Sequence, residues 1–141
     1  MRNDERGQMT VELMVVLPAV VIIAVIAVNA LTFFGMCAEF DRIARNAVRV
    51  CAASPAYGQD VGQSVAQVEQ MIVEAMDLEG EACTVSASQD ALGHTTFDLA
   101  LTYQPTLFGL GLKSEVFGVA LPQLAHSTSL TVDVYKPGML L

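Results

Sequence analysis

Apolar and polar positions divide the chain into an apolar first quarter and a longer part in which the two kinds of residue alternate. From Leu13 to Met36 no residue is charged, and only Asn29 and Thr32 are clearly polar. An α-helix rises about 1.5 Å per residue, so this run is long enough to cross a hydrocarbon core of about 30 Å. We therefore predict a transmembrane helix over residues 8–36, preceded by a short charged segment, residues 1–7.

The segment that follows, residues 37–54, keeps a helical pattern but becomes amphipathic. Its apolar residues recur every three or four positions, as on one face of a helix. They are Phe40, Ile43, Ala47, Val50 and Cys51. Pro55 disfavours helix at the residue before it. We expect the first helix to continue through this segment and to end near Ser54. Pro18, near the start of the helix, removes one backbone hydrogen bond and favours a kink.

A second helix is predicted after a turn at residues 55–60. Asp60 and Gln63 have the spacing of a variant capping box, in which two side chains bond free backbone N–H groups at a helix start. The apolar stripe that follows consists of Val61, Val65, Val68, Ile72, Ala75 and Met76. The pattern stops near residues 77–80, where we expect the helix to end.

Strict alternation of apolar and polar residues predicts half-buried strands over residues 83–88, 95–103 and 127–135. In the last of these, Leu130, Val132 and Val134 are the predicted inward positions. The predicted fold class is α+β: a long N-terminal transmembrane and amphipathic helix, a second short helix, and a small antiparallel sheet of three to four strands. The α+β domain covers residues 55–141.

Residues 106–124 are apolar and rich in glycine, but they show no regular period. Core packing with a loop is one interpretation, and a contact with another subunit or a membrane surface is the other. Exposure of the large side chains distinguishes the two, because a contiguous exposed apolar patch usually marks an interface. These side chains are Leu107, Phe108, Leu110 and Leu112.

The formal net charge is −8, and the acidic excess lies after the balanced first seven residues. An acidic domain argues against binding to nucleic acid or to anionic lipid. The only basic cluster is formed by Arg42, Arg45 and Arg49, whose spacing puts them on one helical face. We expect a solvated or headgroup-facing stripe, with a specific partner site as the alternative.

None of the three cysteines belongs to a C-x-x-C pair, and both histidines lie far from them, so no zinc site is expected. If the domain is exported, a disulfide between Cys51 and Cys83 is the expected pairing, and Cys37 is left over near the membrane. The sequence alone does not fix this connectivity.

The sequence contains none of the familiar catalytic signatures: no G-x-S-x-G elbow, no H-E-x-x-H and no glycine-rich phosphate loop. His94 lies in a predicted turn and His126 just before a predicted strand, so we expect solvated or capping roles. The acidic residues are scattered, as on a solvated face. We therefore predict no enzymatic activity, no cofactor and no metal.

Glu12 stands alone at the start of the apolar run, and the next charge is Glu39. A charge beside a membrane-length stretch is unfavourable unless it has a partner. A secretory signal cleaved at residues 28–30, a plain signal anchor and a buried soluble helix each fit the apolar composition, but none explains this charge. Gly7 followed by four residues and Glu12, ahead of an apolar helix, resembles the processing motif of type IV prepilins.

The neighbouring residues narrow the resemblance. Arg6-Gly7, Thr10-Val11-Glu12 and Val15-Val16-Leu17-Pro18 are similar to the start of TadE-like and TadF-like proteins, which are minor pilins, or pseudopilins, of tight-adherence (Flp-type) pili. The motif covers about thirteen residues. The rest of the chain resembles the family only in architecture.

The resemblance implies that a membrane-embedded aspartyl peptidase cuts after Gly7 and makes Gln8 the first residue. Glu12 would then attract the amino terminus of a neighbouring subunit. The implied partners are the prepilin peptidase, other pilin subunits and membrane lipid. The implied location is a bacterial inner membrane, spanned once, with the domain outside and the chain joining or priming a fibre. A major pilin is little more than the helix, so a minor role is expected. An uncleaved membrane-anchored adaptor and a secreted domain are the alternatives.

Overall fold

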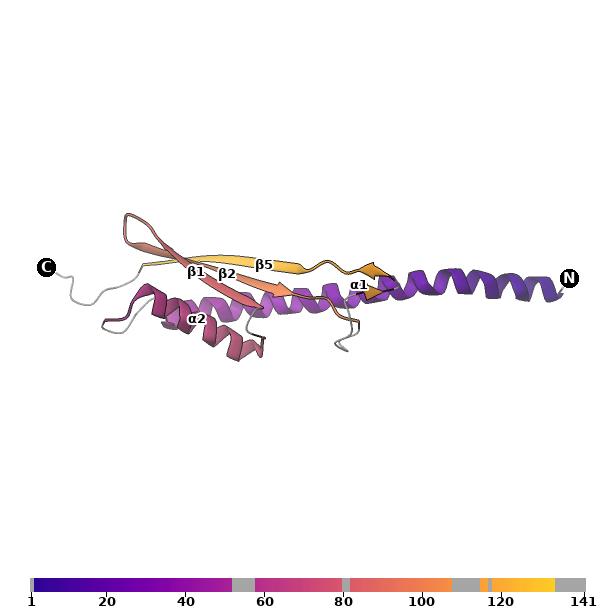
Figure 1. Ribbon diagram of the computed structural model, residues 1–141, viewed down its shortest axis with the longest axis horizontal. Coiled ribbons are helices and arrows are strands. Elements are labelled where there is room, and N and C mark those ends of the chain that lie inside the picture. Colours follow the sequence, from indigo (N-terminus) through magenta and orange to yellow (C-terminus); the bar gives the residue numbers. More distant parts are fainter. Residues whose placement is uncertain (1, 52–57, 80–81, 108–114, 117, 134–141) are drawn as a thin grey trace. The chain divides into compact units, whose positions relative to one another are not determined.

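The computed structural model describes residues 2–51, 58–79, 82–107, 115–116 and 118–133. Its elements follow one another as α1 (Arg2–Cys51), α2 (Val61–Met76), β1 (Cys83–Gln89), β2 (His94–Tyr103), β3 (Glu115–Val116), β4 (Val119–Ala120) and β5 (Leu124–Asp133), as Figure 1 shows. This order confirms the predicted α+β class, with a long amino-terminal helix, a short second helix and a small antiparallel sheet.

The chain divides into two compact units. The first unit contains residues 1–34 and 104–123, and the second contains residues 35–103 and 124–141. Helix α1 contributes residues to both. The first unit includes most of the apolar run, and the second includes the sheet and α2.

The sheet of the second unit has three antiparallel strands in the order β1-β2-β5. β1 and β2 form a hairpin, in which Val85 lies opposite Leu99. Gly93 adopts a φ of 89° in the connecting turn, a backbone conformation that glycine adopts without strain. β5 returns along the other edge of β2 and pairs over ten residues. It begins at Leu124, three residues before the predicted start, and residues 134–135 of that prediction lie outside the described residues.

One face of this sheet forms a core with both helices. The buried residues come from α1, α2, β1 and β2, which makes a two-layer α+β packing. They are Phe40, Ala44, Ala47, Val48, Val68, Ile72, Cys83, Phe97, Leu99 and Leu101. The inward residues of β5, Leu130 and Val132, pack against this core as predicted. The opposite face is rich in Ser and Thr, and Thr96 and Thr131 share a 3.0 Å hydrogen bond across it.

Helix α2 is capped at both ends. Asp60 Oδ1 accepts a hydrogen bond from Val61 N at 2.7 Å, and the Gln63 side chain accepts one from the backbone of Asp60 at 3.4 Å. The predicted capping box is therefore present. At the other end Asp77 takes a left-handed conformation with φ 51°, and its N–H bonds the carbonyl of Val73.

Two positions in the predicted helical stripes are wrong. Val50 is 58% exposed, and the buried positions in its part of α1 are Ala47 and Val48. In α2, Ala75 is exposed and Ser64 is buried. In both helices apolar residues occur on either side of the stripe, and the sheet that packs against the helix decides which of them become buried.

Helix α1 extends further toward the amino terminus than predicted. The sequence predicts a helix from residue 8, but the structure is helical from Arg2. Residues 2–6 contain no proline or glycine, and acidic side chains near a helix start interact favourably with its dipole. Gly7 therefore lies inside a helix. At the other end α1 is described to Cys51, and residues 52–54 of the prediction lie outside the described residues.

Candidate functional site

The first part of α1 carries the predicted processing motif. Gly7 and Gln8 are exposed, and a Cβ atom built on Gly7 would meet no atom within 4 Å. The Oγ1 of Thr10 donates a 2.9 Å hydrogen bond to the carbonyl of Arg6, so this hydroxyl is satisfied within the helix. None of the described residues covers the helix surface at Gly7.

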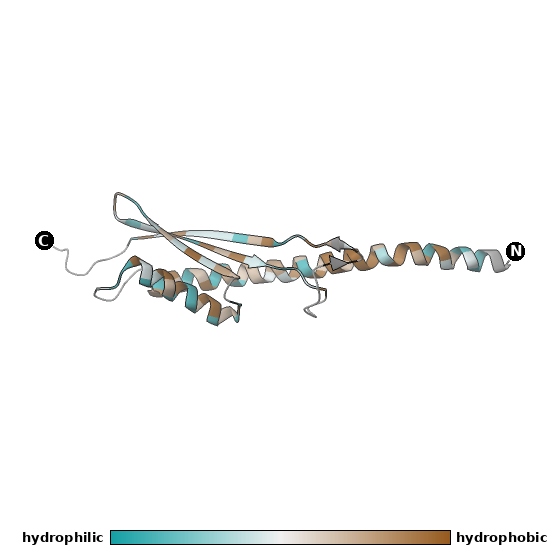
Figure 2. Cartoon of the chain, viewed as in Figure 1, coloured by the Kyte–Doolittle hydropathy of each residue, from teal (hydrophilic) through white to brown (hydrophobic). Residues whose placement is uncertain are grey.

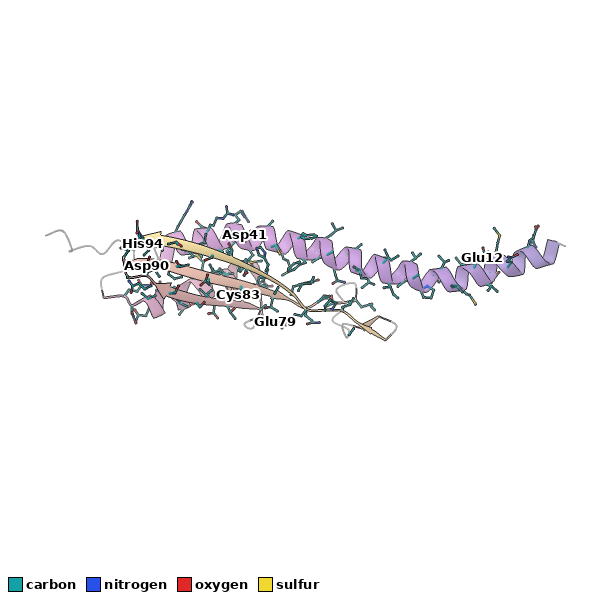
Figure 3. The ribbon with its side chains drawn as sticks, turned by 90° about the horizontal axis from the view of Figure 1, so that it is seen from above. Glu12, Asp41, Glu79, Cys83, Asp90 and His94 are labelled. Atoms are coloured by element: carbon teal, nitrogen blue, oxygen red, sulfur yellow. The ribbon has the colours of Figure 1, made fainter. Side chains whose placement is uncertain are left out.

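Glu12 projects from α1 (Figure 3) and is exposed. It makes no hydrogen bond or ion pair with the part of the chain that the structure describes. Its neighbours Val11 and Leu13 are each 62% exposed. The neighbours of this carboxylate in the sequence are therefore apolar, and the described ranges offer it no partner.

Large apolar side chains cover all faces of α1 after Glu12. Five consecutive residues, 13–17, are exposed, and five residues complete more than one turn of a helix. Figure 2 shows hydrophobic residues, in brown, along this part of α1. A helix that is apolar all round needs a protein interior or a membrane around it. The large apolar residues exposed in residues 9–34 are Met9, Val11, Leu13, Met14, Val15, Val16, Leu17, Val20, Ile23, Ile26, Val28, Leu31 and Phe34.

Helix α1 is long and apolar enough to cross a membrane once, and little of its most apolar stretch is buried within the chain. Two of the predicted transmembrane residues, Pro18 and Met36, are partly buried, and Leu13 is exposed. Pro18 lies inside the helix and has no N–H, so the carbonyl of Met14 lacks its usual partner.

The two polar residues of the apolar run have different roles. Thr32 Oγ1 donates to the carbonyl of Val28 at 2.9 Å, a bond within the helix. Asn29 is 5% exposed, and its Nδ2 donates to the carbonyls of Val25 and Thr106, both at 2.8 Å. Its Oδ1 accepts from Thr106 N at 3.0 Å. One amide side chain thus satisfies both backbone groups of Thr106.

Asn29 is recognisable in the sequence as polar, but its contact with Thr106 is not predictable from it. The two residues are 77 positions apart, and no local pattern connects them. A lone asparagine in an otherwise apolar helix was the available signal. Of the side chains named for residues 106–124, Leu107 is half-buried. Phe108, Leu110 and Leu112 lie outside the described residues, so their exposure stays untested.

All three cysteines are free thiols. Cys83 belongs to the core of the second unit, and Cys51 packs against that core. Burial, and then the charge of Glu69, raise the pKa of the Cys83 thiol to about 11. Burial also raises the pKa of Cys51, and burial followed by the Asp41 charge raises that of Cys37. The disulfide between Cys51 and Cys83 stays a prediction, and in the free state these thiols form the reactive thiolate reluctantly.

Both histidines contact aspartates rather than solvent alone. His126 Nε2 lies 2.8 Å from Asp41 Oδ1, which ties β5 to α1, and the His126 ring meets Phe40 edge-on. His94 lies near Asp90 at the end of the sheet (Figure 3), and its Nε2 is 2.9 Å from Asp133. The described residues contain no group of three or more His, Cys, Asp or Glu placed to hold a metal ion.

The predicted basic cluster lies on one face of α1, where Arg42, Arg45 and Arg49 are exposed. These arginines line an open groove together with Asp41 and Asn46. None of the three guanidinium groups forms an ion pair within the described ranges. The solvated and partner-binding interpretations therefore both remain open at this stripe.

No family model matches the sequence, and no curated protein or solved structure is significantly similar to it.

Proposed function

We propose that the chain is a minor pilin or pseudopilin of a tight-adherence (Flp-type) pilus, made as a prepilin and cut after Gly7 by a prepilin peptidase. One observation carries the proposal. Glu12, which has no partner among the described residues, follows an accessible Gly7 by five residues and precedes a helical stretch, residues 13–17, that is apolar and exposed on all sides. This combination has a physical purpose only where the helix is surrounded by lipid or by other helices.

Processing requires that the peptide bond after Gly7 leave the helical conformation. Gly7 is close to the start of α1, and the first four N–H groups of a helix have no partner within it. Unwinding residues 2–7 therefore breaks only the bonds that their carbonyls accept from the next turn, whereas an interior segment loses bonds on both sides. Glycine is also about 1 kcal/mol less favourable than alanine inside a helix, which makes this position the weak point of the first turns. The peptidase would bind the unwound leader and release Gln8 as a new amino terminus.

Assembly gives Glu12 its role. A charged side chain at the bilayer centre costs about 2.5–3.5 kcal/mol on insertion scales, and less near the edge. Cleavage creates an α-ammonium at Gln8, and the terminus of a neighbouring copy or a related pilin would neutralise the carboxylate. Breaking a buried ion pair is strongly unfavourable because one charge is then left unpaired. The pair would therefore favour the assembled state over isolated subunits in lipid.

The domain after α1 favours a minor pilin over a major pilin. The part outside the helix contains a second helix and a three-stranded sheet, which exceeds what a helix-only major subunit contains. We place it outside the inner membrane of a bacterium, where it would join, prime or cap a fibre. In this role the chain is the substrate of a peptidase and carries out no reaction of its own.

The test is to express the full chain with and without a prepilin peptidase and to determine the new amino-terminal residue. A terminus at Gln8 that depends on the peptidase supports the proposal. A terminus at Leu31 identifies a secreted domain with a cleaved signal peptide. A chain that starts at its original terminus in both samples identifies an uncleaved membrane-anchored adaptor.

A further inference from the structure

The backbone of Thr106 is joined to α1 inside the uncharged run. Asn29, seven residues before Met36, bonds the carbonyl of Thr106 at 2.8 Å and its N–H at 3.0 Å. The segment that carries Thr106, residues 104–107, has neither helix nor strand structure. Irregular backbone therefore contacts α1 at Asn29. The predicted span, residues 8–36, would place this contact well inside the membrane.

A bilayer interior excludes such a segment. Within hydrocarbon, lipid-exposed backbone is found only as helices and closed barrels, because unpaired N–H and C=O groups cannot bond water there. Gln104, two residues before Thr106, has an exposed side chain, and so does Gln123. The transfer of an amide without a hydrogen-bond partner from water into hydrocarbon costs several kcal/mol of free energy. These side chains need water or lipid headgroups around them.

From these contacts we propose that the hydrocarbon span ends at Val28, so that lipid covers the exposed positions of residues 9–28 and Asn29 marks the outer border. Val25, which the chain itself covers, lies one turn inside this border. The inference rests on the proposed membrane role and sharpens it. The shortened span contains about 20 residues, which at 1.5 Å each cover about 30 Å, the thickness of a typical hydrocarbon core. The earlier interpretation, a span that continues to Met36, would bury the Asn29–Thr106 contact in lipid.

The border also changes the position of Glu12. With a span that starts at Met9, Glu12 lies three residues inside it, about 4.5 Å along the helix. Its carboxylate then has less access to headgroups and water, which strengthens the need for a cationic partner. At the other end Leu31 and Phe34, which are 72% and 67% exposed, lie outside the hydrocarbon.

Accessibility of single cysteines tests the border on the full chain. The background carries Cys37→Ser, Cys51→Ser and Cys83→Ala, and far-UV circular dichroism checks that it folds. Ile23→Cys, Leu31→Cys and Phe34→Cys are then introduced one at a time, since all three positions are exposed on α1. Right-side-out membrane vesicles are treated with a membrane-impermeant maleimide, with and without detergent.

We expect Leu31→Cys and Phe34→Cys to react without detergent, and Ile23→Cys to react only after detergent is added. Protection of all three positions would overturn the border at Asn29 while leaving a membrane span intact. Reaction of all three without detergent would overturn the membrane span itself, and with it the proposed function. The two failures are therefore distinguishable.

A second variant tests whether Asn29 sets the border. Asn29→Leu removes both bonds to Thr106 and extends the apolar run, so the helix should move deeper and labelling of Leu31→Cys should fall severalfold. Asn46→Leu, at an exposed position of the same helix, is the matched control and should leave labelling unchanged. Equal labelling in the two variants would contradict the role of Asn29.

Discussion

At the scale of single residues, Thr95 places a polar hydroxyl group in the apolar core. It is fully buried on the inner face of β2, and its Oγ1 has no hydrogen-bond partner among the residues that the structure describes. A buried hydroxyl without a partner costs about 1–3 kcal/mol, because it gives up its bonds to water. Valine has nearly the same shape and lacks the hydroxyl.

Thr95→Val should therefore raise the free energy of unfolding by about 1 kcal/mol, measured by denaturant titration of the full chain in detergent. Thr96→Val is the matched control on the opposite face, where the hydroxyl bonds Thr131. It should give no gain. A lower stability for Thr95→Val would show that the hydroxyl has a stabilising partner.

Cys83 gives a prediction about alkaline pH. Its pKa is about 11 in the folded chain and 9.0 for an unperturbed thiol, so between these values the unfolded chain loses its proton first. The stabilisation is complete below pH 9 and is lost as the pH rises through 11. In reduced protein, stability should fall by an amount on the order of 2 kcal/mol across this window. Cys83→Ala should remove that part of the decline, and an identical decline in both proteins would refute the assignment.

At the scale of elements, the ends of α2 are predicted to respond in opposite directions. Asp60→Ala removes the cap on Val61 N and should lower the stability by about 1 kcal/mol. Asp77→Gly relieves a left-handed conformation at the other end, where glycine is the preferred residue, and should raise it by about 0.5 kcal/mol. Thermal unfolding of both variants measures the difference. Shifts of the same sign would contradict the cap assignment.

The elements also show what sequence patterns could predict. Alternation identified all three strands of the main sheet, because each strand turns one face toward the core, and the capping box located the start of α2. The predicted helical stripes were wrong at Val50 and Ala75, because the sheet that packs against each helix determines which of the neighbouring apolar residues are buried. Asn29 and Thr106 contact each other only in the folded chain, and a local sequence pattern cannot predict such a contact. The Gly7 and Glu12 motif was visible from sequence, and its chemistry stays a prediction.

At the scale of the whole molecule, Glu12 is expected to act in assembly rather than in processing. Glu12→Ala should be cut at the normal rate, while its amount in the sheared fibre fraction should fall by a factor of about 10 or more, because a buried ion pair is lost. Glu5→Ala, which changes an exposed carboxylate in the leader, should behave as wild type in both assays. Normal incorporation of Glu12→Ala into fibres would remove the assembly role.

In the proposed function, the chain becomes active in assembly by losing its first seven residues. Two glycines of α1, Gly7 and Gly35, both have open space where a Cβ would lie, so alanine fits at either position without a clash. Only the first is expected to be a cleavage site. An effect confined to Gly7 would therefore reflect recognition by the peptidase and not a change in the fold.

The most direct measurement is the intact mass of the wild-type chain, Gly7→Ala and Gly35→Ala after coexpression with a prepilin peptidase. We expect wild type and Gly35→Ala to lose the mass of residues 1–7, and Gly7→Ala to keep it. An unchanged mass for the wild-type chain, or equal cutting of all three proteins, would show that Gly7 is not a prepilin cleavage site.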